Sequence, residues 1–264
     1  MSDETEKLRL GGMALRNGLL VHGPTHWAAA VRRKDGSIAV GSGRKPRLRV
    51  ADGVAGVRGL LRLAEAVAVL PLVKRGLPEA RLPWQDARVL AAVAAASAGG
   101  RLVRSRGAGR TGAEAMLAAL SVLPSVVALR GGEVAEWHGV EHKAIAAYET
   151  DGDASDAAKE HDRCGSHLMA PMLAANLAGT ALLRRITKEP SQAAQGVVAL
   201  AAMGVAVEVF AWSERHGTTR TAQLLRRPGH ELQRMLGTRE PTEEQLDVGR
   251  AALAEIVRVE RSPS

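Results

Sequence analysis

The stretch "GVVALAAMGVAVEVFAW", residues 196–212, is the strongest indication of the fold, because it is apolar except for one charged side chain, that of Glu208. It lies within a longer apolar run, residues 190–213, and a second run without Asp, Glu, Lys or Arg covers residues 164–183. Both runs reach the ~20 residues that an α-helix needs to cross a bilayer. Their many Ala and Gly residues suit closely packed helices, in a membrane or in the middle of a soluble bundle. The sequence therefore predicts long apolar helices and leaves the choice between these two environments open.

The composition favours a mainly α-helical chain. Aromatic residues make up 2% of the sequence, with one Phe and one Tyr, so Ala, Val and Leu must supply most of the core. Ala and Leu favour helices over the strands of a β-sandwich. Two further apolar runs, residues 89–100 and residues 115–129 with Pro124 inside it, are shorter than a membrane-spanning helix requires. We therefore expect a helical, membrane-associated bundle whose number of spans stays open.

Residues 1–50 differ from the remainder of the chain. They are rich in Gly, and "HWAAAVRRKDGSIAVGSG", residues 26–43, has the pattern of two short strands joined by Lys-Asp-Gly at residues 34–36. From Val54 onward the pattern becomes helical. We therefore predict a small N-terminal β-hairpin unit over residues 1–50 and a helical metal-site domain over residues 51–264, which would contain the candidate membrane segments.

The net charge of +8 suits an anionic partner. Arg residues are scattered in ones and twos, as in "GRLVRSRGAGR" and "LLRRITK", and few aromatic side chains are present to stack on bases. Nucleic acid is therefore a poor candidate. Anionic membrane lipid is the partner that we expect, and it would place the chain at the cell membrane.

A short motif, His138-Gly139-Val140-Glu141-His142, points to a metal site. It is an H-x-x-E-H sequence, the inverse of a common zinc-protease motif. Residues four apart lie on one face of a helix, so both imidazoles can reach one ion while the glutamate lies nearby. Zinc held in this way lowers the pKa of its bound water toward ~7, and a nearby carboxylate can accept the proton. The alternative is a solvated helix with two surface histidines, because so short a pattern can arise by chance.

A second cluster, "KEHDRCGSH", places His161, Cys164 and His167 at a spacing of three residues. Imidazole and thiolate so placed can share an ion. Cys164 alone fits equally well as a small buried side chain. Glu149 lies on the same helical stripe as the histidine pair but ~10 Å beyond His142 along the helix axis, which makes it a poor ligand.

Glu208 stands alone among apolar residues, where an unpaired carboxylate is costly to bury in lipid or in a protein core. An isolated acid in such a run marks a functional site, here an inner ligand or proton relay beside the turn that carries His161 and Cys164. The alternative is an amphipathic helix with Glu208 on its solvated face, near Glu214.

Several blocks of sequence resemble one bacterial family. They are "GGMALRNG" with the following "HG" and "AAAVRRKDG", "GVRGLLRLAEA", "HGVEHKAIAAYE", "RCGS" and "PGHELQRMLGTREPTEEQLDV". Together they make the chain similar to the YqhQ-like family, which is grouped under domain of unknown function 1385. The resemblance extends along nearly the whole chain. It implies a multi-pass membrane protein and a metal-dependent enzyme without an established reaction.

The resemblance also implies a set of polar site residues. The family's polar signature falls on His138, Glu141, His142, Lys143, Tyr148, Glu149, His161, Arg163, Cys164 and Glu208. His167 is outside this signature, which lowers its weight as a ligand. Asn17 stands where the family usually has Glu, and the apolar runs here are shorter and richer in Ala.

These observations lead us to expect a divalent metal ion, zinc by preference. Its predicted ligands are His138, His142, His161 and Cys164. Glu141 would be the general base and Glu208 an inner ligand or proton relay in a membrane-associated hydrolase of unknown substrate. The alternative is a non-catalytic membrane scaffold with a structural metal site, because four protein ligands would close the site, whereas a catalytic site leaves one position open. A basic RNA-associated protein is a third hypothesis, and it requires salt-dependent binding.

Overall fold

The computed structural model describes residues 7–46, 58–105, 111–130, 132–188 and 190–262. Four strands form an antiparallel sheet in which each strand pairs with the next: β1 (Gly11–Ala14), β2 (Gly18–His22), β3 (His26–Arg32) and β4 (Ile38–Arg44). The predicted hairpin is β3 and β4, and its turn contains Gly36 at a φ of 85°, a conformation that favours glycine. The N-terminal β unit is therefore confirmed, with two more strands than the pattern of residues 26–43 predicted.

The other described elements are helical, as predicted. They are α1 (Arg58–Ala68), α2 (Leu70–Gly76), η2 (Pro83–Gln85), α3 (Ala87–Ser105), α4 (Thr111–Arg130), α5 (Glu133–Thr150), η3 (Gly165–Leu168), α6 (Met169–Ile186), α7 (Gln192–Arg215), α8 (Arg220–Leu232), η4 (Gln233–Gly237) and α9 (Glu243–Arg261). The elements η2 and η3 are 3₁₀ turns, and η4 is a π-helical turn. Helix α9 begins with a capping box, in which the Thr242 side chain accepts from the Gln245 N–H and the Gln245 side chain accepts from the Thr242 N–H.

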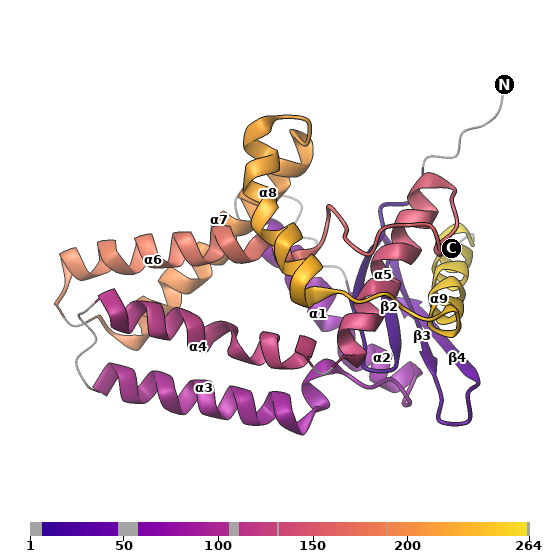
Figure 1. Cartoon of the computed structure of the whole chain (residues 1–264), viewed down its shortest axis with the longest axis horizontal. Coiled ribbons are helices and arrows are strands. Elements are labelled where there is room, and N and C mark those ends of the chain that lie inside the picture. The colour runs from indigo at the N-terminus through magenta and orange to yellow at the C-terminus, as the bar shows by residue number, and fades with distance from the viewer. Residues whose placement is uncertain (1–6, 47–57, 106–110, 131, 189, 263–264) are drawn as a thin grey trace.

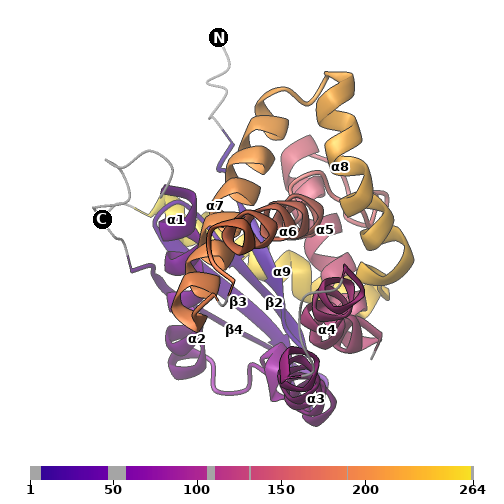
Figure 2. The same ribbon diagram turned by 90° about the vertical axis from the view of Figure 1, so that its left-hand side faces the viewer.

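The sheet lies between two layers of helix (Figure 2). Because side chains alternate across a strand, Leu19 and Val21 of β2 face α5 and α9, whereas Leu20 faces α2. On the first face they pack with Trp137 of α5 and Ile256 of α9. The N-terminal sheet thus shares its core with helices from the second half of the chain. The predicted boundary at residue 50 lies outside the described residues.

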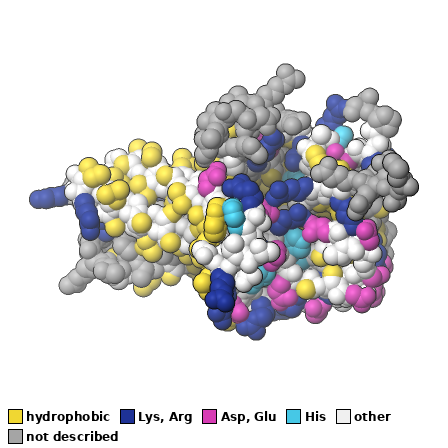
Figure 3. All heavy atoms as spheres, turned by 90° about the horizontal axis from the view of Figure 1, so that it is seen from above, with side chains coloured by type: hydrophobic (Ala, Val, Ile, Leu, Met, Phe, Trp, Pro, Cys, Tyr) yellow, Lys and Arg dark blue, Asp and Glu magenta, His cyan; other side chains and the backbone are white. Residues whose placement is uncertain are grey.

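Two helix pairs, α3 with α4 and α6 with α7, extend from this body as an arm (Figure 1). In the described part of the chain, the segments Gly165–Ile186 and Gln192–Arg215 are long and apolar enough to cross a membrane. A core helix of a soluble protein can pass the same test, but a core helix is mostly buried. Here only 6% of the apolar window of the first segment and 11% of that of the second are buried, and Val197 and Leu200 of the second are 66% and 65% exposed. Hydrophobic side chains cover the visible face of the arm (Figure 3).

Candidate metal centre

Three side chains converge on one point in the structure. His138, His142 and Cys164 each offer one ligand atom, and these atoms all lie within 4.8 Å of one another. The two imidazoles are one turn apart on α5, with ring centroids separated by 4.3 Å. Cys164 ends the loop that follows α5, and its Sγ lies 3.3 Å from His138 Nε2. The three side chains line a cavity of about 410 Å³ and could hold a metal ion.

Backbone carbonyls fix the orientation of both imidazoles. His138 Nδ1 donates to the Gly237 carbonyl (2.8 Å), and His142 Nδ1 donates to the Lys159 carbonyl (2.6 Å). Each bond leaves the lone pair on Nε2, the arrangement found in histidines that bind metals. His142 Nε2 is buried and has no hydrogen-bond partner within the described chain. Because a buried acceptor normally has a partner, this orphaned nitrogen fits a site built for a cation.

Burial keeps His142 and Cys164 uncharged when no cation is bound. It lowers the pKa of His142 to about 2, with a further contribution from His138, so this imidazole stays neutral. Burial likewise raises the pKa of the Cys164 thiol, although the Ser166 N–H donates to its Sγ (3.4 Å). A bound cation reverses this effect, because it favours the thiolate directly. The donors therefore suit a metal that binds imidazole and thiolate.

Glu141 is buried in the same cavity, under strand β1. A Cβ added to Gly12 would overlap the Glu141 side chain, so the carboxylate fits into space that only glycine leaves. Burial raises the pKa of Glu141 to about 7, and Cys164 also raises it, while His138 and a hydrogen bond from the Ala14 backbone oppose the shift. The carboxyl group lies where it can exchange a proton with a molecule in the cavity.

His161 lines the cavity, but both of its ring nitrogens are already engaged. Nδ1 accepts from the Arg163 N–H (3.2 Å), and Nε2 faces Glu149 Oε2 (3.4 Å). Its ring centroid lies 5.7 Å from that of His142. The structure therefore brings together three of the four predicted ligands and leaves His161 beside them. Glu149, too distant to be a ligand, instead orients His161 and forms an ion pair with Arg163.

Glu208 is not brought into the cluster. Ala202 and Ala206 mark the buried side of α7, and Glu208 follows Ala206 by two residues, roughly 200° around the helix. Its side chain is exposed and does not line the cavity. Glu214 is closer to the site, because burial lowers the pKa of His161 and the charge of Glu214 opposes that shift. Its side chain is 15% exposed, and its carboxylate accepts from Arg9 (2.7 Å).

His167 also lies outside the ligand group. Its Nδ1 donates to the Arg226 carbonyl (3.0 Å), and its ring stacks on Phe210 of α7, with centroids 6.2 Å apart. Helix α7 therefore packs against the turn η3 through Phe210, whereas the expected position of Glu208 beside the turn that carries His161 and Cys164 is not found.

Sequence reasoning missed Gln233, which organises the loop beneath the site. This fully buried side chain accepts from the His161 N–H (2.8 Å) and donates to Ser166 Oγ (2.8 Å). It opens the π-helical turn η4, whose last residue, Gly237, supplies the carbonyl that orients His138. Such turns are frequent at functional sites. The available signal was the place of Gln233 in the C-terminal block of the family resemblance.

Gly139, inside the H-x-x-E-H motif, has a packing role. A Cβ at this position would overlap the carbonyl oxygen of Arg239, and the Arg239 N–H donates to the Ala135 carbonyl (2.9 Å). The connection between η4 and α9 therefore lies directly on α5. This close approach brings the Gly237 carbonyl within reach of His138.

Comparison with known proteins identifies the family. No curated protein and no solved structure matches the chain. A family model described as "Protein of unknown function (DUF1385)" matches residues 121–259, more than half of the chain. This range contains the H-x-x-E-H motif, the Cys164 loop and the π-helical turn. The chain therefore belongs to the DUF1385 family of proteins of unknown function.

Proposed function

We propose that this protein is a membrane-anchored, metal-dependent hydrolase. His138, His142 and Cys164 would hold a divalent ion, and two imidazoles with one thiolate suit zinc. The observation that carries the proposal is the buried, unpartnered Nε2 of His142 among three convergent donors.

The ligand count favours a catalytic site over a structural one. A structural zinc site is closed by four protein ligands, whereas a catalytic site keeps one position open. The fourth predicted ligand, His161, has both ring nitrogens engaged by Arg163 and Glu149. When bound, a divalent ion supplies Lewis acidity that makes water a nucleophile near neutral pH. Glu141, in the same cavity, would accept the proton of that water.

The position of the cavity supports action at a membrane surface. Cys164 and Ser166 lead directly into α6, and Leu129 of α4 lines the same cavity. The metal centre thus lies where the apolar arm joins the body of the protein. A substrate would reach it at the level of the membrane interface, and the exposed surfaces of α6 and α7 would lie in the bilayer.

Metal content tests the ligand set. We expect roughly one tightly held divalent ion per chain by elemental analysis. His142→Ala with Cys164→Ala should abolish binding, whereas His161→Gln should lower the affinity by only about 10- to 100-fold, as for a residue beside the ligands. His216→Ala, a histidine at the end of α7, is the matched control. Absence of an ion, or its retention after replacement of His142 and Cys164, would contradict the proposal.

Activity and spectroscopy then separate the catalytic site from a structural one. On zinc-loaded protein with p-nitrophenyl acetate and bis(p-nitrophenyl) phosphate, Glu141→Gln should retain the metal and lose hydrolysis by about 100-fold or more. In cobalt-substituted protein, added azide should change the absorption spectrum if one position is open. Equal rates for both proteins, with a spectrum unchanged by azide, would support the structural scaffold instead.

Alkaline carbonate extraction of cell membranes tests the anchor. The chain should stay in the membrane pellet, because α6 and α7 expose apolar residues along their length. Complete release into the soluble fraction would refute membrane insertion while leaving the metal site to its own tests.

A further inference from the structure

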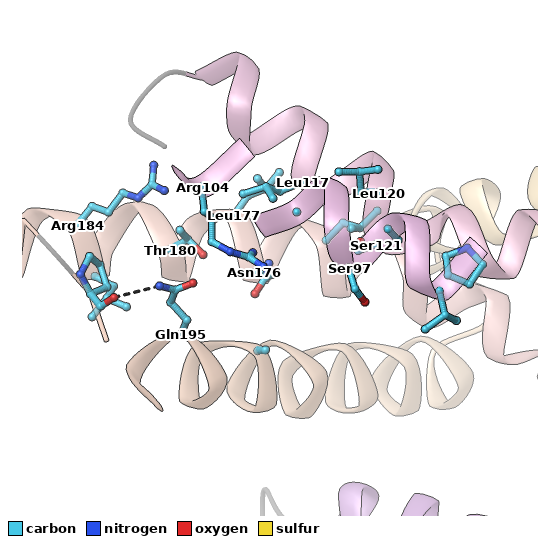
Figure 4. Close-up of a pocket in the computed structure, with 18 of the residues that line it drawn as sticks. Ser97, Arg104, Leu117, Leu120, Ser121, Asn176, Leu177, Thr180, Arg184 and Gln195 are labelled. Carbon is cyan, nitrogen blue, oxygen red and sulfur yellow. Dashed lines mark hydrogen bonds between the residues drawn. The ribbon is translucent and has the colours of Figure 1, made fainter. Parts of the chain in front are cut away.

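The two helix pairs of the arm enclose a groove that shares no residue with the metal cavity. Its volume is about 1000 Å³, at the upper end of the range for small-molecule sites. Side chains of α3, α4, α6 and α7 line it (Figure 4). Leu117 and Leu120 of α4 and Leu173 and Leu177 of α6 give it apolar walls, which Ser121 and Asn176 interrupt with polar groups.

One end of the groove is basic. Arg104 in the last turn of α3, Arg184 in the last turn of α6 and Lys188 just beyond it all line the groove. Lys and Arg side chains are visible at the tip of the arm (Figure 3). The Arg104 guanidinium lies 3.3 Å from the position that a Cβ on Gly100 would occupy, so this glycine leaves room for Arg104 to fold back along the groove.

The groove runs beside α6, and the length of this helix is comparable to the thickness of a bilayer. Helix α6 has 18 residues and therefore a length of about 27 Å, close to the ~30 Å hydrocarbon core of a bilayer. With the body of the protein at one interface, Arg104 and Lys188 would lie at the opposite headgroup layer. Thr180, one turn before Arg184 on α6, also lines the groove and offers a hydroxyl at the depth of ester carbonyls.

We propose that this groove binds one anionic phospholipid taken from the bilayer. The acyl chains would lie against Leu117, Leu120 and Leu177, and the phosphate would contact Arg104 and Lys188. Charge complementarity selects this occupant, because an apolar groove with a cationic end fits an amphiphile with an anionic headgroup. The proposal depends on the membrane location proposed above and is independent of the metal centre.

Lipid retention by the full chain tests the proposal. Protein purified in detergent would be delipidated and titrated with phosphatidylglycerol or phosphatidylcholine of the same acyl composition, and the bound lipid counted by native mass spectrometry. We expect one phosphatidylglycerol per chain. Arg104→Gln with Lys188→Gln should weaken its binding about 30-fold, the effect of two charges worth ~1 kcal/mol each.

The matched control removes the same charge from the same two helices. Arg101→Gln with Arg185→Gln replaces arginines of α3 and α6 that do not line the groove, and it should change binding less than about twofold. Leu177→Trp, which fills the groove without changing charge, should reduce retention of phosphatidylglycerol.

Several outcomes would overturn the proposal. Equal retention of the two lipids would remove the role of the basic end, and equal losses in the two double variants would indicate attraction by surface charge alone. Lipid-free protein that forms a dimer, with Leu177→Trp disrupting it, would assign the groove to a second copy of the chain. Zinc content measured on the same samples keeps this test separate, since lipid binding without zinc contradicts only the proposed hydrolase.

Discussion

Replacement of Gln233 by leucine should loosen the metal centre without touching a ligand. Leucine has a similar volume, so Gln233→Leu leaves no large cavity but removes the hydrogen bonds to the His161 N–H (2.8 Å), the Ser166 hydroxyl (2.8 Å) and the His161 carbonyl (3.2 Å). Each such bond contributes about 1 kcal/mol net, and a buried N–H left without a partner costs about 1–3 kcal/mol. We therefore expect a loss of about 2–4 kcal/mol in the free energy of unfolding.

Thermal unfolding of the metal-free protein in detergent measures this loss. For a chain of this size about 3 kcal/mol corresponds to a fall of roughly 6–12 °C in Tm. Zinc affinity should fall about 10- to 100-fold, because the loop that carries Cys164 is no longer held in place. Gln195→Leu is the control: the Gln195 side chain is exposed and makes one hydrogen bond within the described structure, to the Pro190 carbonyl (3.0 Å). A Gln233→Leu protein with wild-type Tm and wild-type zinc affinity would refute this account of the loop.

Three further outcomes are expected. Glu208→Gln should leave zinc affinity within about twofold of wild type, whereas Glu214→Gln should lower it several-fold, because Glu214 is the acid near the site. Competition with a chelator measures both affinities. The reverse order of the two variants would restore Glu208 to the site. Gly139→Ala should destabilise the fold by about 1–3 kcal/mol, because the added Cβ would overlap a backbone carbonyl. Gly196→Ala, on an open face of α7, should stabilise the fold by about 0.5–1 kcal/mol. Thermal unfolding measures both changes. Burial lowers the pKa of His22 from 6.5 to about 4, so between pH 6.5 and pH 4 the unfolded chain binds more protons than the folded chain. The free energy of unfolding should therefore fall by at most about 3 kcal/mol from pH 6.5 to pH 4. His22→Phe should flatten this acid limb in unfolding measured against pH, and an unchanged slope would contradict the shift.

Local patterns predicted those parts of the fold that depend on neighbouring residues. The Lys-Asp-Gly turn predicted the β3–β4 hairpin, because a turn signal acts within a few residues. The capping box of Thr242 and Gln245 at the start of α9 is a signal of the same local kind. Strands β1 and β2 gave weaker signals, since half of β1 (GGMA) is glycine and the short apolar run of β2 (GLLVH) has no alternation that marks a strand. The packing of α9 on a sheet more than 200 residues earlier depends on tertiary contacts that no local pattern contains.

The same distinction applies to the metal centre. His138 and His142 share a helical face by spacing alone, so their pairing could be predicted. The spacing of His161 and Cys164 could not show which of the two turns toward the pair, because loop side chains point where their hydrogen bonds direct them. The carbonyls of Lys159 and Gly237 were not predictable, since a backbone carbonyl is present at every position. The resemblance marked the block that contains Gln233 but gave this residue no role.

Asn17 shows why one departure from the family resemblance need not affect the site. Its Nδ2 donates to the carbonyls of Arg32 and Glu79 (both 3.1 Å), and its Oδ1 accepts from the Arg81 N–H (2.9 Å). An ionised glutamate has no donor and could not make the first two bonds. In this chain the residue at position 17 ties the β1–β2 turn to the segment after α2.

The geometry of α6 separates the roles of its two ends. The candidate metal cavity includes Ser166, just before the helix, whereas Arg184 and Lys188 of the proposed lipid groove lie at its other end. These ends are about 27 Å apart, because α6 has 18 residues at 1.5 Å each. A phosphate held at the basic end would therefore lie in the leaflet opposite to the metal centre. The groove lipid would act as part of the anchor, and the substrate of the metal centre would approach from the side of the sheet and helices α5 and α9.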